Sequence, residues 1–151
     1  MARPLTGRRN SGPWFSRFGE VIRFERGART VYPGLKVRQR LGSNRIYEIN
    51  MPVPHYDARL VEIRFPAASP HVPRVTVDGP EPHHNYGKNA LCMWCPSDPR
   101  CERWVFEDGL LQLLGLTQRH LFMEAWYLEH EEWLGPEAPH GPDLAKRRGG
   151  E

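Results

Sequence analysis

All three cysteines of this 151-residue chain fall in one short stretch, residues 83–104, which reads HHNYGKNALCMWCPSDPRCERW. Thiolates and imidazoles are the side chains that attack carbonyl groups, bind soft metal ions and carry out redox chemistry. The residues of these two types in the stretch are Cys92, Cys95, Cys101, His83 and His84. Thiol or thiol-metal chemistry in this protein must therefore be centred here.

One hypothesis for this stretch is a metal site. The three cysteines, together with His83 or His84, supply enough soft ligands for a tetrahedral zinc ion. Zinc ribbons and knuckles usually pair two close two-ligand units, whereas Cys101 lies in a proline-rich segment with no nearby fourth ligand after it. The spacing fits such a site poorly, and we predict no metal ion and no other cofactor.

A second hypothesis is covalent catalysis, in which a cysteine attacks the carbonyl carbon of an ester or thioester. Asn85 and the two histidines before it precede Cys92 by seven to nine residues. A loop of that length can bring an amide or an imidazole beside the sulfur, where it would stabilise the oxyanion that develops during attack.

A third hypothesis assigns no chemistry to the stretch. Cys92 is flanked by the apolar residues Leu91 and Met93. Free cysteines are often buried and inert, so Cys92 can equally be a core residue with the remaining residues forming a loop. The pattern of residue types leaves all three hypotheses open.

Length and composition limit the kind of protein. The chain is long enough for one ordinary domain, which we place at residues 13–134. The basic N-terminus, residues 1–12, and the Pro/Gly-rich, basic tail, residues 135–151, are expected to be flexible. The sequence has neither a run of apolar residues long enough for a membrane span nor an apolar signal core, which predicts a cytoplasmic protein.

The net charge of +3 conceals an asymmetry along the chain. Residues 1–50 carry eleven Lys and Arg against three Asp and Glu, whereas residues 51–151 carry ten against fifteen. A basic segment of this kind can bind nucleic acid or an acidic partner, or simply form a solvated face. Because the arginines are scattered and follow no aromatic pattern, nucleic acid is not the expected partner.

Alternating apolar residues predict an antiparallel sheet. Residues 45–51 place Tyr47, Ile49 and Met51 on one face, and residues 60–65 place every second residue on one face in the same way. Residues 74–77 form a shorter run, and a weak run near residues 32–41 supplies a fourth strand. We therefore expect a meander of about four strands with one solvated face.

Helical periodicity flanks these strands. A first helix is predicted from Trp14 to near Gly27. After the cysteines, Asp108 would cap a short helix that stops at Gly115, and Thr117 would cap a longer one that continues to about Trp133. The leucines of both helices are expected in the core. We interpret four glutamates as a solvated helix face: Glu124, Glu129, Glu131 and Glu132.

The order of several motifs resembles that of the ubiquitin-conjugating enzymes. The matching runs are residues 47–51 (YEINM), 61–66 (VEIRFP), 69–77 (SPHVPRVTV), 83–85 (HHN), 91–92 (LC) and Trp104. In that family a strand ending in Phe-Pro leads through a Pro-rich turn into another strand, a His-Pro-Asn motif, the catalytic cysteine and a Trp before the C-terminal helices. The resemblance covers roughly residues 30–134 and implies an α+β fold with the catalytic loop after the last strand.

The resemblance also implies roles for the site residues. Cys92 aligns with the thioester-forming cysteine, Asn85 with the amide that donates to the tetrahedral oxyanion, and His83 with the residue that braces the loop. The implied reaction joins Cys92 to the C-terminal carboxylate of a partner protein and then passes it to a lysine amine. Because the chain has no Gly-rich nucleotide loop, an activating enzyme or a partner with a labile C-terminus is implied as well.

Three departures from the family pattern leave alternatives open. His84 stands where the family has proline, the interval from Asn85 to Cys92 is one residue shorter, and residues 95–101 are inserted before the tryptophan. Cys101, placed between two arginines that favour a thiolate, is a rival nucleophile. Cys95 could instead form a regulatory disulfide with it, or either of the two could resolve an oxidised Cys92.

The run at residues 91–99 (LCMWCPSDP) resembles bacterial members of the family encoded in antiphage operons. Among these are the standalone conjugating enzymes of CBASS immunity, whose conjugated partner is a nucleotide cyclase. The alternative function is a non-catalytic, protein-binding or zinc-stabilised module on the same fold, with its basic N-terminal third docked on an acidic partner.

Overall fold

The computed structural model describes residues 12–39, 43–85, 87, 89–95 and 97–135. Its elements, in chain order, are η1 (Trp14–Ser16), α1 (Phe18–Phe24), α2 (Ala28–Val31), β1 (Lys36–Gln39), β2 (Arg45–Val53), β3 (Tyr56–Phe65), β4 (Arg74–Val77), η2 (Arg100–Glu102), η3 (Phe106–Asp108) and α3 (Gly109–His130). The flexible ends predicted from the sequence lie outside the described residues, apart from Gly12 and Gly135. The architecture is α+β, as expected.

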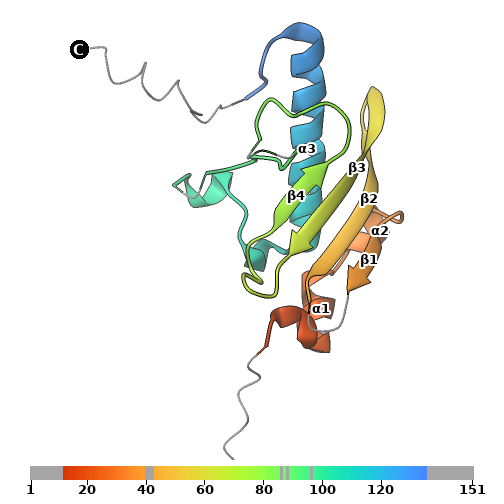
Figure 1. Ribbon diagram of the computed structural model, residues 1–151, viewed down its shortest axis with the longest axis vertical. Helices are drawn as coiled ribbons and strands as arrows, with labels where there is room; N and C mark the ends of the chain where they lie inside the picture. Colours follow the sequence, from red (N-terminus) through yellow and green to blue (C-terminus); the bar gives the residue numbers. More distant parts are fainter. Residues whose placement is uncertain (1–11, 40–42, 86, 88, 96, 136–151) are drawn as a thin grey trace, which may run out of the picture.

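The four strands form one antiparallel sheet in the order β1-β2-β3-β4 (Figure 1). Each strand pairs with its neighbour in sequence, which is the predicted meander. Tyr47 lies opposite Ile63, and Val61 lies opposite Val77. Because side chains alternate along a strand, these pairs place the apolar residues of three strands on a single face.

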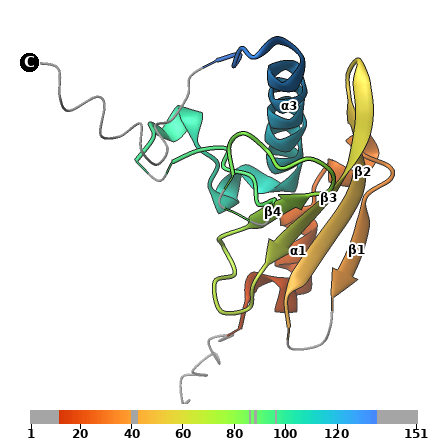
Figure 2. The same ribbon diagram turned by 45° about the horizontal axis from the view of Figure 1, so that its top comes forward.

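That apolar face of the sheet forms one side of the hydrophobic core. Its buried residues come from β2, β3 and β4 and are Tyr47, Ile49, Met51, Val53, Val61, Ile63, Phe65, Val75 and Val77. Helix α3 packs on β2 and β3 (Figure 1). Its buried leucines include Leu110, Leu113 and Leu121. Helices α1 and α2 also contact α3, so all three cover the same side of the sheet (Figure 2).

The prediction of one helix from Trp14 to near Gly27 is wrong. The segment forms η1, α1 and α2, because Arg17 is extended (φ −114°) and Gly27 adopts a left-handed conformation (φ 76°). The two breaks turn Trp14, Phe24 and Ala28 into the core, whereas Phe18 of α1 is 80% exposed. The apolar residues of this segment have helical spacing, but the backbone bends at the two breaks and both Trp14 and Phe24 are buried.

The prediction of two helices after the cysteines is also wrong. Residues 109–130 form the single helix α3, with an exposed Gly115 in its interior. Thr117 is fully buried, and its hydroxyl donates to the Leu113 carbonyl (2.8 Å) rather than capping a new helix. The helix ends at His130, before Trp133, and its Leu128 is exposed. No helix among the described residues is long and apolar enough to cross a membrane.

Candidate functional site

The chain returns along the edge of β4 before it reaches Cys92. The Val77 N–H donates to the Asn89 carbonyl (3.1 Å), and the Leu91 N–H donates to the Val75 carbonyl (2.8 Å). An isolated antiparallel bridge pairs Thr76 with Ala90. Residues 89–91 therefore extend the sheet by a short fifth segment and place Cys92 directly beyond its edge.

A second antiparallel contact brings the histidines and Asn85 to the cysteine. Asn85 bridges to Leu91, and the Cys92 N–H donates to the His84 carbonyl (3.1 Å). The Asn85 side chain folds this turn upon itself, since its Nδ2 donates to the Pro82 carbonyl (2.5 Å). His84, Asn85 and Cys92 thus lie together, although the sequence separates them by several residues.

A buried glutamate on α3 holds the histidine segment in place. Glu124 is 3% exposed, and its two carboxylate oxygens accept the backbone N–H groups of His83 (2.7 Å) and His84 (2.9 Å). The Nε2 atom of His120, one turn earlier on α3, lies 3.2 Å from Glu124 Oε1. The prediction that Glu124 belongs to a solvated helix face is wrong, because the loop after β4 folds over it.

These contacts determine the protonation of Glu124. Burial alone raises the pKa of the carboxyl, because it disfavours the charged form. The contact with His120 and the hydrogen bonds from the His84 and His83 N–H groups act in the opposite direction and outweigh burial, so the pKa of Glu124 is lowered from its ordinary value of 4.5. Glu124 is therefore a carboxylate at neutral pH.

Aromatic rings enclose the same cluster. The His83 ring stacks on Tyr127 of α3, with centroids 3.9 Å apart and planes at 19°. Beyond the end of α3, Glu131 adopts a left-handed conformation (φ 56°), and Trp133 follows it. The Trp133 ring lies 4.3 Å from the His84 ring and 5.3 Å from the His120 ring. The imidazoles that precede Cys92 are thus packed against α3 and the segment that follows it.

The three thiols differ in their exposure. Cys92 is only 6% exposed, Cys95 is half-buried and Cys101 is exposed. Burial, followed by the charge of Asp98, raises the pKa of the Cys95 thiol, which disfavours its thiolate. None of these cysteines, all within the described residues, is in a disulfide. Nor does any group of three or more His, Cys, Asp or Glu in the described ranges have the geometry to hold a metal ion.

The surroundings of Cys101 differ from the expectation. Arg100 was expected to promote a thiolate, but its guanidinium forms two hydrogen bonds with Asp108 (2.9 and 3.1 Å). Asp108 also accepts the Val105 N–H (3.0 Å) and so fastens η2 to the start of η3. Its carboxylate offsets the positive charge of Arg100, which weakens the electrostatic case for Cys101. The exposure of Cys101 still makes it the most accessible thiol.

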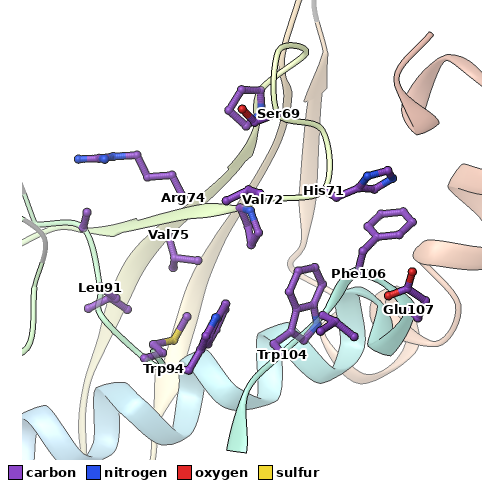
Figure 3. Close-up of a pocket in the computed structure, with 15 residues that line it drawn as sticks. Ser69, His71, Val72, Arg74, Val75, Leu91, Trp94, Trp104, Phe106 and Glu107 are labelled. Atoms are coloured by element: carbon purple, nitrogen blue, oxygen red, sulfur yellow. The ribbon is translucent and has the colours of Figure 1, made fainter. Parts of the chain in front are cut away.

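An apolar groove of about 720 Å³ lies beside the cysteine segment (Figure 3). Leu91 and Met93, the neighbours of Cys92, are among its lining residues, together with Trp94 and Trp104. The Trp104 ring is fixed by a hydrogen bond from its Nε1 to the Gly109 carbonyl (2.9 Å). The polar side chains at the groove include His71, Arg74 and Glu107 (Figure 3).

We did not predict from the sequence that the site includes Glu124, His120, Tyr127 and Trp133. A signal for the first was nevertheless present. The buried residues of α3 recur at helical spacing, and Glu124 falls in that stripe seven residues after Thr117 and four after His120. A carboxylate in an otherwise apolar stripe indicates a buried, partnered charge.

No family model, curated protein or solved structure matches this chain. The resemblance to ubiquitin-conjugating enzymes therefore rests on the order of motifs, and the structure shows only the α+β class with a four-stranded antiparallel sheet.

Proposed function

We propose that the protein is a cysteine-dependent acyl transferase that resembles ubiquitin-conjugating enzymes, with Cys92 as the nucleophile. The observation that carries this proposal is the antiparallel contact in which the Cys92 N–H bonds to the His84 carbonyl while Asn85 bridges to Leu91. It brings a thiol, an amide side chain and an imidazole into one small region, and such groups can serve acyl transfer as nucleophile, oxyanion donor and base.

The proposed reaction has two steps. The Cys92 thiolate attacks the thioester carbonyl at the activated C-terminus of a partner protein, and the tetrahedral oxyanion collapses with loss of the donor thiolate. A lysine amine then attacks the new thioester, an amide forms, and the Cys92 thiol is restored. We assign Asn85 as the donor to the oxyanion, because its Nδ2 carries a second hydrogen besides the one given to Pro82.

The resemblance to conjugating enzymes of CBASS operons leads us to propose a nucleotide cyclase as the partner that donates its C-terminus. The chain contains no sequence motif for carboxyl activation. The donor must consequently be activated by another enzyme or arrive with a labile C-terminal bond. The product would be a cyclase linked through its C-terminus to a lysine amine.

Three observations bear on the choice of nucleophile. Cys92 is 6% exposed, so its sulfur must become accessible before it can attack a protein C-terminus. Cys101 is exposed without any rearrangement, which makes it the second candidate. Cys95 ranks third because burial and Asp98 raise its pKa.

The low exposure of Cys92 also favours a second function, a non-catalytic protein-binding module. In that case the thiol is a core residue, and the apolar groove lined by Trp94 and Trp104 is the feature available for binding. The two functions differ in one measurable property: an acyl transferase forms a covalent adduct on a cysteine, whereas a binding module does not.

The test uses the full chain and a synthetic peptide thioester, which replaces the activated partner. Intact-protein mass spectrometry should detect an acyl adduct that hydroxylamine removes and that free lysine discharges. Cys92→Ala should abolish the adduct, and Cys92→Ser should convert it to a more stable ester. Cys95→Ala is the matched control, because it removes a neighbouring thiol and should leave the adduct intact.

Each result has a distinct meaning. An adduct that persists in Cys92→Ala and disappears in Cys101→Ala would move the nucleophile to Cys101. Absence of any adduct in the wild-type chain at millimolar donor, with all thiols reduced, would contradict the transferase and leave the binding module.

A further inference from the structure

We propose that Glu124 is a positioning residue for Cys92, acting through the backbone of His84. This inference rests on the proposed function, because it assigns Glu124 a role in placing the nucleophile. The residue lies on α3, 32 positions after the cysteine, and the family resemblance noted above does not include it. Its role is inferred from the contacts that join α3 to the cysteine segment.

A continuous path of two hydrogen bonds connects the carboxylate to the cysteine. Glu124 Oε1 accepts the His84 N–H at 2.9 Å, and the His84 carbonyl accepts the Cys92 N–H at 3.1 Å. The His84 N–H therefore donates to a charged acceptor, and the His84 carbonyl accepts the backbone N–H of the proposed nucleophile. Any displacement of His84 from α3 shifts the partner of the Cys92 amide.

Both oxygens of the carboxylate are needed for this arrangement. The second oxygen, Oε2, accepts the His83 N–H at 2.7 Å, so two successive amides point at one side chain. Hydrogen bonds to a charged acceptor are about twice as strong as those between neutral groups. A glutamine would present one acceptor and one NH₂ group, and the NH₂ group would face a backbone donor. Glutamine is therefore nearly the same shape but cannot satisfy both amides.

Other side chains hold this clamp, the Glu124 carboxylate with the N–H groups of His83 and His84, in place. His120 Nε2 lies 3.2 Å from Glu124 Oε1, and the Trp133 ring packs against both His120 and His84. Tyr127, almost one turn after Glu124, stacks on the His83 ring. Because the carboxylate contacts His83, His84 and His120, and aromatic rings pack on these histidines, the position of residues 83 and 84 is tied to α3, which in turn packs on the sheet.

A purely structural need for burial would favour a different residue. The position lies in the apolar stripe of α3, where an aliphatic side chain would pack without the cost of removing a charge from water. A buried carboxylate needs hydrogen-bond donors that offset this cost. Here the groups it binds are the two amides that lead into the antiparallel contact with Cys92.

The experiment compares the full-length wild type with Glu124→Gln and with Glu132→Gln, an exposed glutamate that serves as the matched control. The first measurement is single-turnover acylation of Cys92 by the peptide thioester across donor concentrations. The second is amide hydrogen exchange at residues 83, 84 and 92, compared with exchange in β2 and β3. His120→Gln, which keeps the carboxylate but loosens one of its contacts, is a milder variant should Glu124→Gln not fold.

In Glu124→Gln, we expect the acylation rate constant to fall at least about tenfold with an unchanged half-saturating donor concentration, because misplacement affects chemistry rather than donor binding. Exchange at the three amides should become about 10- to 100-fold faster while the sheet keeps its protection. His120→Gln should change both measurements in the same direction by a smaller factor. Glu132→Gln should change neither.

Wild-type acylation in Glu124→Gln would overturn the inference, and so would exchange that accelerates equally in the loop and in the sheet. If the wild type forms no adduct on Cys92, the proposed function fails first. Local loss of protection in Glu124→Gln would then show that the contact is structural only, which overturns the positioning role as well. The two failures are therefore distinguishable.

Discussion

The contribution of Glu124 to the stability of the fold should depend on pH in a defined way. At neutral pH, Glu124→Gln replaces two hydrogen bonds to a charged acceptor, from His83 and His84, by one to a neutral acceptor. A hydrogen bond to a charged group contributes about 1.5–3 kcal/mol, and one between neutral groups about 1 kcal/mol. The His83 bond is only partly buried and counts at the low end. The expected loss of unfolding free energy is about 2–3.5 kcal/mol.

The sign of the pH dependence follows from the direction of the pKa shift. The pKa of Glu124 in the folded protein is lowered from 4.5, so the native state favours its ionised form. The stabilisation is fully present above pH 4.5 and is lost as the pH falls through the lower folded pKa. The titratable groups facing the carboxylate are His120 on α3 and His83 and His84 on the loop, and all three remain in the variant.

The assay is urea unfolding of wild type, Glu124→Gln and Glu132→Gln at a series of pH values from 7 to 3. The difference in unfolding free energy between wild type and Glu124→Gln should be no smaller at pH 5 than at pH 7 and should shrink in more acidic buffer. Glu132→Gln should follow the wild type throughout. A difference that stays the same down to pH 3 would refute the charged clamp, because a neutral hydrogen-bonding role does not titrate.

Three further outcomes are expected. Brief alkylation of the native protein should label Cys101 first and Cys92 last, with the difference abolished in urea; equal rates before urea would contradict the burial of Cys92. Burial raises the pKa of Tyr47 well above its ordinary value of 10.0, so its phenol should stay protonated in the folded state. The unfolded chain loses this proton near pH 10, so the contribution of Tyr47 to the unfolding free energy should be fully present below pH 10 and decline above it. Absorbance titration of wild type against Tyr47→Phe measures this, and an ordinary phenol titration in the wild type would count against it. Trp104→Ala should cost about 3–5 kcal/mol in urea unfolding, because a buried indole and its hydrogen bond to Gly109 are removed; a loss below 1 kcal/mol would show that the ring is not part of the core.

Much of the sheet could be predicted from the sequence because its signal is local. Alternation in residues 45–51 and 60–65 identified two strands and the buried face of Tyr47, Ile49 and Met51, and residues 74–77 matched β4. Antiparallel neighbours joined by short turns need no long-range information. The weak run at residues 32–41 yielded β1, which is shorter than the run itself.

The predictions that were wrong concern residues whose environment is determined by distant parts of the chain. Gly115 and Thr117 resemble a helix boundary, but packing of Leu113 and Leu121 on the sheet keeps α3 continuous through them. Glu124 has the sequence context of a solvated residue and becomes buried only because residues 83 and 84 fold onto it. The sequence identified Asn85 and Cys92 as a candidate pair. It did not identify the hydrogen bonds to Glu124 that connect this region to α3.

The contact of Glu124 with the N–H groups of His83 and His84 also bears on the order in which the protein folds. The sheet joins only neighbouring strands, so its contacts close short loops and can form early. The bond between Glu124 and His84 spans 40 residues and requires α3 to be docked already. We therefore expect Glu124→Gln to accelerate unfolding and to leave the refolding rate almost unchanged. The sheet would then be complete before the cysteine segment takes its place beside it.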